Sequence, residues 1–234
     1  MDLTGRITGM ITNPKETVQD ISKNPYIEEA VLIVGIFAIF SALSGYLSQN
    51  LVIYEFVGVD QGNLGNSGSS VLGIFTAFIG VIIIWIIATG VVHIVSVALG
   101  GEGTFKQMLI IYSYAYIPLL IGTVISLILI SFMKPINLTF DFSTYDLSTA
   151  SSFINLIIDI MSTTTKTLMS NPYYQAMYII TSMLKLWSIG MVILGVKYIH
   201  NLNTNRALIA VIIPLSFFVI MNVITLYFTF IYKI

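Results

Sequence analysis

Five long apolar stretches limit how this chain can fold. They cover about residues 26–48, 71–99, 108–133, 176–199 and 207–232, and each is free or nearly free of charge. A helix needs roughly 20 mostly apolar residues to cross about 30 Å of hydrocarbon, so each stretch is long enough to span a bilayer. The stretches lack the short apolar–polar alternation of a transmembrane barrel. We therefore expect an all-α, polytopic bundle of five transmembrane helices.

The composition excludes several other classes of protein. Charged residues make up 9% of the 234 residues, whereas soluble domains carry about 25%. Ten basic against eleven acidic side chains leave no positive excess for binding nucleic acid. The chain has no cysteine, HExxH or GxSxG, and its two histidines have no carboxylate at helical ligand spacing. We therefore expect no catalytic residue, no cofactor and no metal.

The positions of lysine and arginine predict the orientation of the bundle. Short cytoplasmic loops retain positive charge, and five spans place the two chain ends on opposite sides of the membrane. The segment after the first span carries Glu55 and Asp60 but no lysine or arginine, so we expect it outside. With the N-terminus in the cytoplasm and the C-terminus outside, Lys185 lies within a span and the other nine basic residues divide six to three. Arg6, Lys15, Lys23, Lys106, Lys197 and Arg206 are inside, and Lys134, Lys166 and Lys233 are outside.

Two segments outside the spans show helical amphipathicity. Residues 1–25 form a polar segment that we expect in the cytoplasm, before a membrane domain of residues 26–234. The apolar side chains of this segment lie along one helical face, which is interrupted at Asn13-Pro14. Residues 152–169 repeat apolar side chains at helical spacing but are too short and polar to span. We expect short amphipathic interfacial helices here, and for 152–169 a re-entrant segment packed into the bundle is the alternative.

A lysine near the middle of the fourth span is the most informative single residue. A charge near the bilayer centre costs about 2.5–3.5 kcal/mol on insertion scales, and such residues usually face the bundle interior and have a partner. Lys185 shares a polar stripe with Ser182 and Ser188, and Asp159 is a candidate partner if its segment re-enters. We expect a structural lysine in the bundle interior; a pathway for a solute or proton, and snorkelling towards an interface, are the alternatives. We expect His93 to be a hydrogen-bonded packing residue near the interface. The alternative is a proton relay with Lys185, which would require the two residues to lie close together.

Charged and aromatic residues mark the predicted cytoplasmic ends of two spans. Glu28 and Glu29 occupy the first turn of the first span, where the helix dipole and the headgroup region both accommodate carboxylates. We expect them to mark the interface, with partner docking as the alternative. Tyr112, Tyr114 and Tyr116 predict an aromatic belt at the start of the third span.

The third span is preceded by a glycine-rich link. The run GGEGTFK lacks the Walker A spacing and a preceding strand, so we do not expect it to bind nucleotide. Gly100, Gly101 and Gly103 instead predict a tight turn with special backbone angles, and Thr104 predicts a helix cap. Pro118 predicts a kink farther along the span.

Taken in order, these features resemble the Yip1-domain integral membrane proteins, a five-span family found from prokaryotes to the eukaryotic secretory pathway. The resemblance covers almost the whole chain. It rests on prolines before the first span, the glycine-rich turn, a tyrosine–alanine–proline run and two later motifs: Asn13-Pro14, Asn24-Pro25, Gly100 to Phe105, Tyr114 to Pro118, Leu186-Trp187 through Gly195, and Arg206-Ala207. The long proline-rich tail of many eukaryotic members is absent, so the chain resembles a minimal prokaryotic member, and we expect a prokaryotic cell membrane.

The resemblance implies an integral membrane scaffold. Eukaryotic relatives associate with small Rab-type GTPases, with each other and with curved transport membranes, so a small GTPase is a partner by family analogy alone. We expect a scaffold or adaptor in the bilayer, as a homo-oligomer or hetero-oligomer, with the N-terminal helices, the glycine-rich turn and residues 200–206 as the docking face. The alternative is a transporter or channel for a small solute or ion, with its pathway around Lys185.

Overall fold

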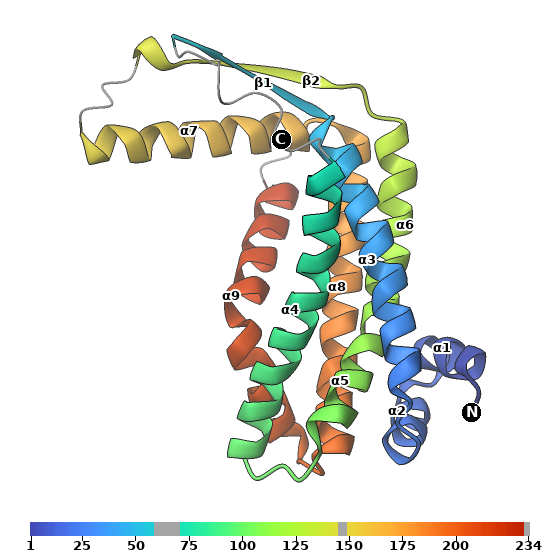
Figure 1. Ribbon diagram of the computed structural model, residues 1–234. Helices are drawn as coiled ribbons and strands as arrows, with labels where there is room; N and C mark the ends of the chain where they lie inside the picture. Colours follow the sequence, from blue (N-terminus) through green and yellow to red (C-terminus); the bar gives the residue numbers. More distant parts are fainter. Residues whose placement is uncertain (59–70, 145–148, 232–234) are drawn as a thin grey trace.

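The computed structural model describes residues 1–58, 71–144 and 149–231, and most of its regular structure is helical. Long helices pack side by side into one bundle (Figure 1). Each of the five apolar stretches forms one long helix or, in the third, a bent pair: α3 (Ile27–Gln49), α4 (Val71–Ala98), α5 (Phe105–Tyr114) with α6 (Tyr116–Ser131), α8 (Pro172–Ile199) and α9 (Thr204–Ile231). The all-α prediction for the bundle is confirmed.

Four segments in the described residues are long and apolar enough to cross a membrane. They are Ile27–Gln49, Leu72–Ala98, Phe105–Ser131 and Pro172–Ile199. The last helix, α9, is 28 residues long and contains Pro214. Among the residues whose side chains the structure describes, its apolar stretch is the shorter Thr204–Ser216. The chain is therefore a multi-pass membrane protein.

Local capping explains why two spans begin earlier than expected. The third begins at Phe105 because Thr104 and Gln107 form a reciprocal capping box. The fourth begins at Pro172 because the Asn171 side chain accepts hydrogen bonds from the Tyr173 and Tyr174 amides. The predicted Thr104 cap is confirmed.

The third span bends where Pro118 predicted a kink. Proline has no N–H and its ring crowds the carbonyl four residues earlier, which here belongs to Tyr114, the last residue of α5. Ala115 separates α5 from α6, and its carbonyl accepts a hydrogen bond of 2.6 Å from the Ser188 hydroxyl of α8. A neighbouring helix thus supplies a side-chain partner at the break.

Two short helices fold back against one end of the bundle, called the N-terminal end here. They are α1 (Leu3–Thr12) and α2 (Pro14–Lys23), and they lie beside the starts of α3 and α5 (Figure 1). Their apolar stripe contributes Met10, Val18 and Ile21 to the main core, where all three are fully buried. This burial attaches the helices to the bundle.

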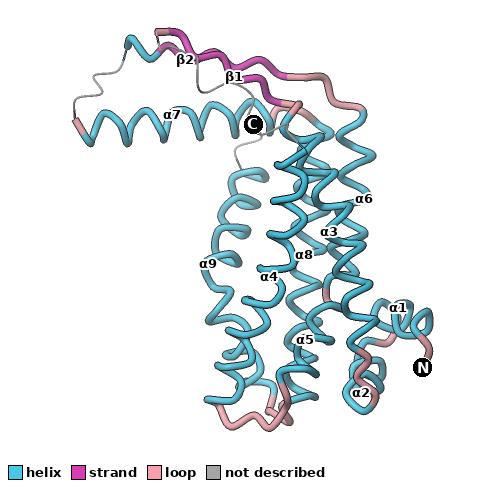
Figure 2. Tube along the Cα trace, viewed as in Figure 1, coloured by secondary structure: helices cyan, strands magenta, loops and turns pink. Residues whose placement is uncertain are grey.

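The opposite end carries a small sheet that the all-α expectation did not include. Strands β1 (Val52–Val57) and β2 (Ile136–Asp141) pair in parallel, with Val52 opposite Ile136 (Figure 2). They follow α3 and α6, which run towards the same end, so their extended continuations are parallel. Helix α7 (Ala150–Met169) crosses this end at a steep angle to the spans. Its position relative to a membrane stays a prediction.

Candidate functional site

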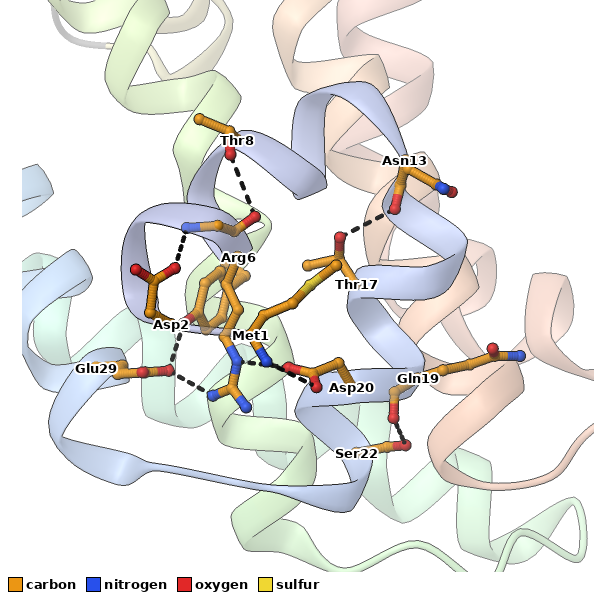
Figure 3. Close-up of polar contacts among 12 residues, drawn as sticks. Met1, Asp2, Arg6, Thr8, Asn13, Thr17, Gln19, Asp20, Ser22 and Glu29 are labelled. Atoms are coloured by element: carbon orange, nitrogen blue, oxygen red, sulfur yellow. Dashed lines mark hydrogen bonds and ion pairs between the residues drawn. The ribbon is translucent and has the colours of Figure 1, made fainter.

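A buried arginine joins the N-terminal helices to the bundle. Arg6 of α1 is fully buried. Its Nε donates to Asp20 Oδ2 of α2 at 2.8 Å, and its Nη1 donates to Glu29 Oε2 of α3 at 2.7 Å. The chain's N-terminal ammonium also contacts Asp20, at 3.1 Å (Figure 3). One cation therefore bridges carboxylates from two other helices.

Tyr114 completes this cluster from inside the bundle. Its side chain is fully buried, and its hydroxyl donates to the same Glu29 oxygen that Arg6 contacts. Burial alone would lower the pKa of Arg6, but hydrogen bonds and charge from Glu29 and Asp20 outweigh burial and raise it. Burial would likewise raise the pKa of Asp20, yet the Arg6 guanidinium and the N-terminal ammonium lower it. Hydrogen bonds between charged groups make this a strong attachment.

The cluster changes the interpretation of several predicted residues. Glu28 is exposed, whereas the Glu29 side chain is only 16% exposed and contacts Arg6 and Tyr114 rather than a headgroup. The predicted tyrosine belt is wrong, because Tyr112 and Tyr116 are also buried. These aromatic side chains pack inside the bundle.

Sequence reasoning missed Arg6 and Asp20 as functional residues. Arg6 is 14 residues from Asp20 and 23 from Glu29, so no local spacing reveals either pair. A signal was present, because Arg6 lies beside Leu3, Ile7 and Met10 on the apolar side of its helix. A cation on an apolar stripe needs a buried partner.

Two histidines tie the two links at the N-terminal end together. His200, at the end of α8, is fully buried. Its Nδ1 accepts a hydrogen bond from the Gly103 amide at 3.2 Å, and its Nε2 lies 3.3 Å from His93 Nδ1. Neutral His200 therefore carries its proton on Nε2, and this N–H donates a hydrogen bond to His93 Nδ1. Burial, followed by the neighbouring His93, lowers the pKa of His200 to about 4.

The glycine-rich turn packs against this histidine. Gly100 has a φ of +88°, as the expected special angle requires. Gly101 and Gly103 are glycines for a different reason, which corrects the prediction: they lack space for a side chain. A Cβ at Gly101 would lie 2.6 Å from His200 Nδ1, and a Cβ at Gly103 would lie 2.8 Å from the Ile199 carbonyl oxygen.

Further contacts join the N-terminal helices and both links into one surface. The Arg206 side chain donates to the Leu99 carbonyl at 3.3 Å, and the Gln107 side chain donates to the Ser22 carbonyl of α2 at 3.0 Å. We call this surface the N-terminal platform: α1, α2, the turn at 99–104 and the loop at 200–203. The structure thus brings together the three segments that the sequence proposed as a docking face.

Lys185 lies apart from the platform, in a surface pocket rather than in the bundle interior. Its side chain is exposed and borders a half-open pocket of about 140 Å³ between α3, α6 and α8. The pocket is also lined by Phe37, Leu119, Gly122, Thr123 and Thr181. Within the described part of the chain, Lys185 forms neither an ion pair nor a hydrogen bond.

The other members of the expected intramembrane polar site do not join Lys185. His93 contacts His200, which lies about 22 Å from Lys185 along α8 at 1.5 Å per residue, so His93 and Lys185 lack the proximity that the alternative of a proton relay requires. Ser188 is engaged at the bend, and Asp159 lies on α7 near Thr163. Ser182 is fully buried, and its hydroxyl has no hydrogen-bond partner in the described residues.

The remaining motif residues have separate environments. Trp187 is 40% exposed on the outside of α8. Gly195 allows α8 to approach Ile111 of α5 very closely. In the described residues no group of three or more histidine, aspartate or glutamate side chains gathers as a metal site would require.

Comparison with known proteins identifies the family. A family model described as the Yip1 domain matches residues 8–226. An uncharacterized protein of Methanocaldococcus jannaschii is 31% identical over 128 residues, which are 54% of this chain and 89% of that protein. No solved structure matches the chain. Because the family match runs from within α1 to within α9 and covers most of the chain, this chain belongs to the Yip1 domain family of membrane proteins.

Proposed function

We propose that this protein is a membrane scaffold or adaptor that presents the N-terminal platform to a protein partner on the cytoplasmic side. The observation that carries the proposal is the attachment of α1 and α2 through buried Arg6 to Asp20 and Glu29. A segment held in this way is a preformed surface. A preformed surface loses less conformational entropy on binding than a mobile tail, so more of the contact energy contributes to affinity.

The outer side of the platform has the chemistry of a protein-binding surface. Lys15, Glu16, Lys23 and Glu102 are exposed there, so both signs of charge are present. Mixed charge supports selection of a partner by electrostatic complementarity. A small GTPase is the partner class that the family resemblance suggests, and the proposal requires only a cytoplasmic protein.

The transporter alternative receives less support from the geometry. A pathway needs polar side chains along one route, but His93, Ser188 and Asp159 contact groups in three different places. Lys185 and Thr181 line the pocket between α3, α6 and α8. Solute flux is therefore an outcome of the experiment below rather than our proposal.

The test compares the two ends of the molecule in native membranes. The tagged chain is purified in mild detergent, and co-purifying proteins are quantified by mass spectrometry. We expect one cytoplasmic protein in stoichiometric amount, lost in Lys15→Glu with Lys23→Glu and retained in Lys166→Glu on α7. Equal recovery with both variants, or no partner together with solute flux in vesicles, contradicts the adaptor function.

The same proposal requires the platform to be cytoplasmic. The chain has no cysteine, so one introduced cysteine reports the side on which it lies. Thr12→Cys on the platform and Ser151→Cys on α7 are both at exposed positions. We expect a membrane-impermeant maleimide added to intact cells to label the α7 cysteine alone. Labelling of the platform cysteine in intact cells contradicts the proposed side.

A further inference from the structure

The middle of the fourth span carries a cation, Lys185, that forms no ion pair within the described residues. Lys185 is the fourteenth of the 28 residues of α8, so it lies near the centre of the bilayer. A charge at that depth is costly unless it pairs or reaches a polar region. As described above, Lys185 has no ion-pair or hydrogen-bond partner in the described residues.

The sequence shows why an internal partner is unavailable at this depth. The spans contain two carboxylates, Glu28 and Glu29, both in the first turn of α3, and Glu29 is engaged by Arg6 and Tyr114. The chain's other nine acidic residues fall outside the spans: Asp2, Glu16, Asp20, Glu55, Asp60, Glu102, Asp141, Asp146 and Asp159. A second copy of the chain has the same deficit, so self-association would add a lysine but no carboxylate at mid-membrane.

The pocket beside Lys185 is of the size of one side chain. Its volume of about 140 Å³ is below the roughly 300–1,000 Å³ of small-molecule sites. The hydroxyls of Thr123 and Thr181 already donate to carbonyls of their own helices, at 2.9 and 2.8 Å. Among the residues that line the pocket, the Lys185 ammonium is therefore the side-chain donor left to bind a ligand. The pocket thus favours an anionic acceptor.

We propose that this pocket receives the carboxylate of a glutamate or aspartate in a transmembrane helix of a different protein. Phosphate headgroups lie about 15 Å from the centre of a hydrocarbon core that is about 30 Å thick, so a membrane-embedded carboxylate is the better match in depth. The pocket is half open and borders α3, α6 and α8, so a neighbouring helix can approach it from the bilayer. This interface is separate from the N-terminal platform and does not depend on the adaptor function.

The experiment uses a synthetic helix as the probe. A leucine–alanine transmembrane peptide with one central glutamate is compared with peptides carrying glutamine or leucine at that position, in phosphatidylcholine vesicles with the full-length protein. The protein is labelled at Ser131→Cys, an exposed position at the end of α6. Energy transfer between this label and a labelled peptide reports association.

We expect the glutamate peptide to bind about fivefold more tightly than the leucine peptide, the size usual for a polar contact between membrane helices. Lys185→Met should remove this preference, and Lys185→Arg should retain it. The charge-swapped pair, Lys185→Glu with a lysine peptide, should restore preferential binding. Thermal unfolding of each variant shows that the protein remains folded.

Two outcomes overturn the proposal. One is equal binding of the glutamate and leucine peptides to the wild-type protein. The other is a glutamate preference that persists in Lys185→Met. Equal binding of the two peptides could be accompanied by an effect of oleate. If oleate raises the melting temperature of the wild type and not of Lys185→Met, the occupant is a lipid carboxylate and the helix proposal is wrong.

Discussion

Arg6 and Lys185 are two cations in opposite settings. Arg6 lies in a short helix outside the spans, yet it is fully buried and contacts carboxylates of two other helices. Lys185 lies within a span, yet it is exposed at the bundle surface and has no partner in the described residues. The depth of a side chain in the membrane and its burial within the protein are therefore separate properties. The cation in the platform is paired within this chain, whereas the cation in the span is unpaired among the described residues.

Removal of the buried cation should have the largest effect on stability. Arg6→Met leaves Asp20 and Glu29 without their shared partner, and loss of one member of a buried pair costs about 3–5 kcal/mol. Their carboxylates are partly exposed, so we expect the lower end of this range. Unfolding of the purified protein measures the change. Glu28→Ala, at an exposed position one residue from Glu29, should remain within about 0.5 kcal/mol of the wild type; an equal loss would contradict the role of the cluster.

Acid should weaken the platform through His200. Its pKa is lowered to about 4, so between about 6.5 and 4 the unfolded chain binds a proton that the folded protein excludes. Stability is therefore greatest above about 6.5 and falls with pH by at most about 1.4 kcal/mol per unit down to about 4. Unfolding measured from pH 7.5 to 4.5 tests this, and His200→Gln should flatten the curve. An unchanged slope in that variant would assign the acid sensitivity to another group.

Adding a methyl group in the glycine-rich turn should lower stability more than adding one to a glycine within a span. Gly101→Ala places a methyl group 2.6 Å from His200 Nδ1 and 2.8 Å from the Ser96 carbonyl oxygen. Such overpacking typically costs about 1–3 kcal/mol. Gly190→Ala meets no atom within 4 Å and should be neutral or stabilising. Melting temperatures of the two variants give the comparison, which fails if both fall alike.

Substitution of Lys185 should have the smallest effect on stability. Lys185→Met removes a charge that has no partner in the described residues, so we expect stability to stay within about 1 kcal/mol of the wild type, or to rise. The measurement is the same unfolding experiment in detergent, beside Arg6→Met. A loss as large as that of Arg6→Met would mean that Lys185 stabilises the fold after all.

Long-range contacts decided the features that sequence reasoning missed. The spans and the bend at Pro118 follow from composition and from proline chemistry, so both were predictable. Strand pairing between Val52 and Ile136 depends on α3 and α6 ending side by side. No local sequence pattern predicts that the ends of these two helices lie together. The contact between Tyr114 and Glu29 joins residues 85 positions apart, so local sequence predicts an interface belt for Tyr114 and not this contact.

The membrane class, the apolar spans, the glycine-rich turn and the family resemblance can all be predicted from the sequence, because hydropathy and the chemistry of proline and glycine act over a few residues. Tertiary structure alone decided that Glu29 faces Arg6, that His200 packs under Gly101 and Gly103, and that Lys185 borders a pocket instead of an internal partner. These outcomes depend on which helix faces pack together. A helix that is apolar around much of its circumference has no single apolar face, so its sequence does not predict which face packs against a neighbour. Contacts between distant residues determine this instead.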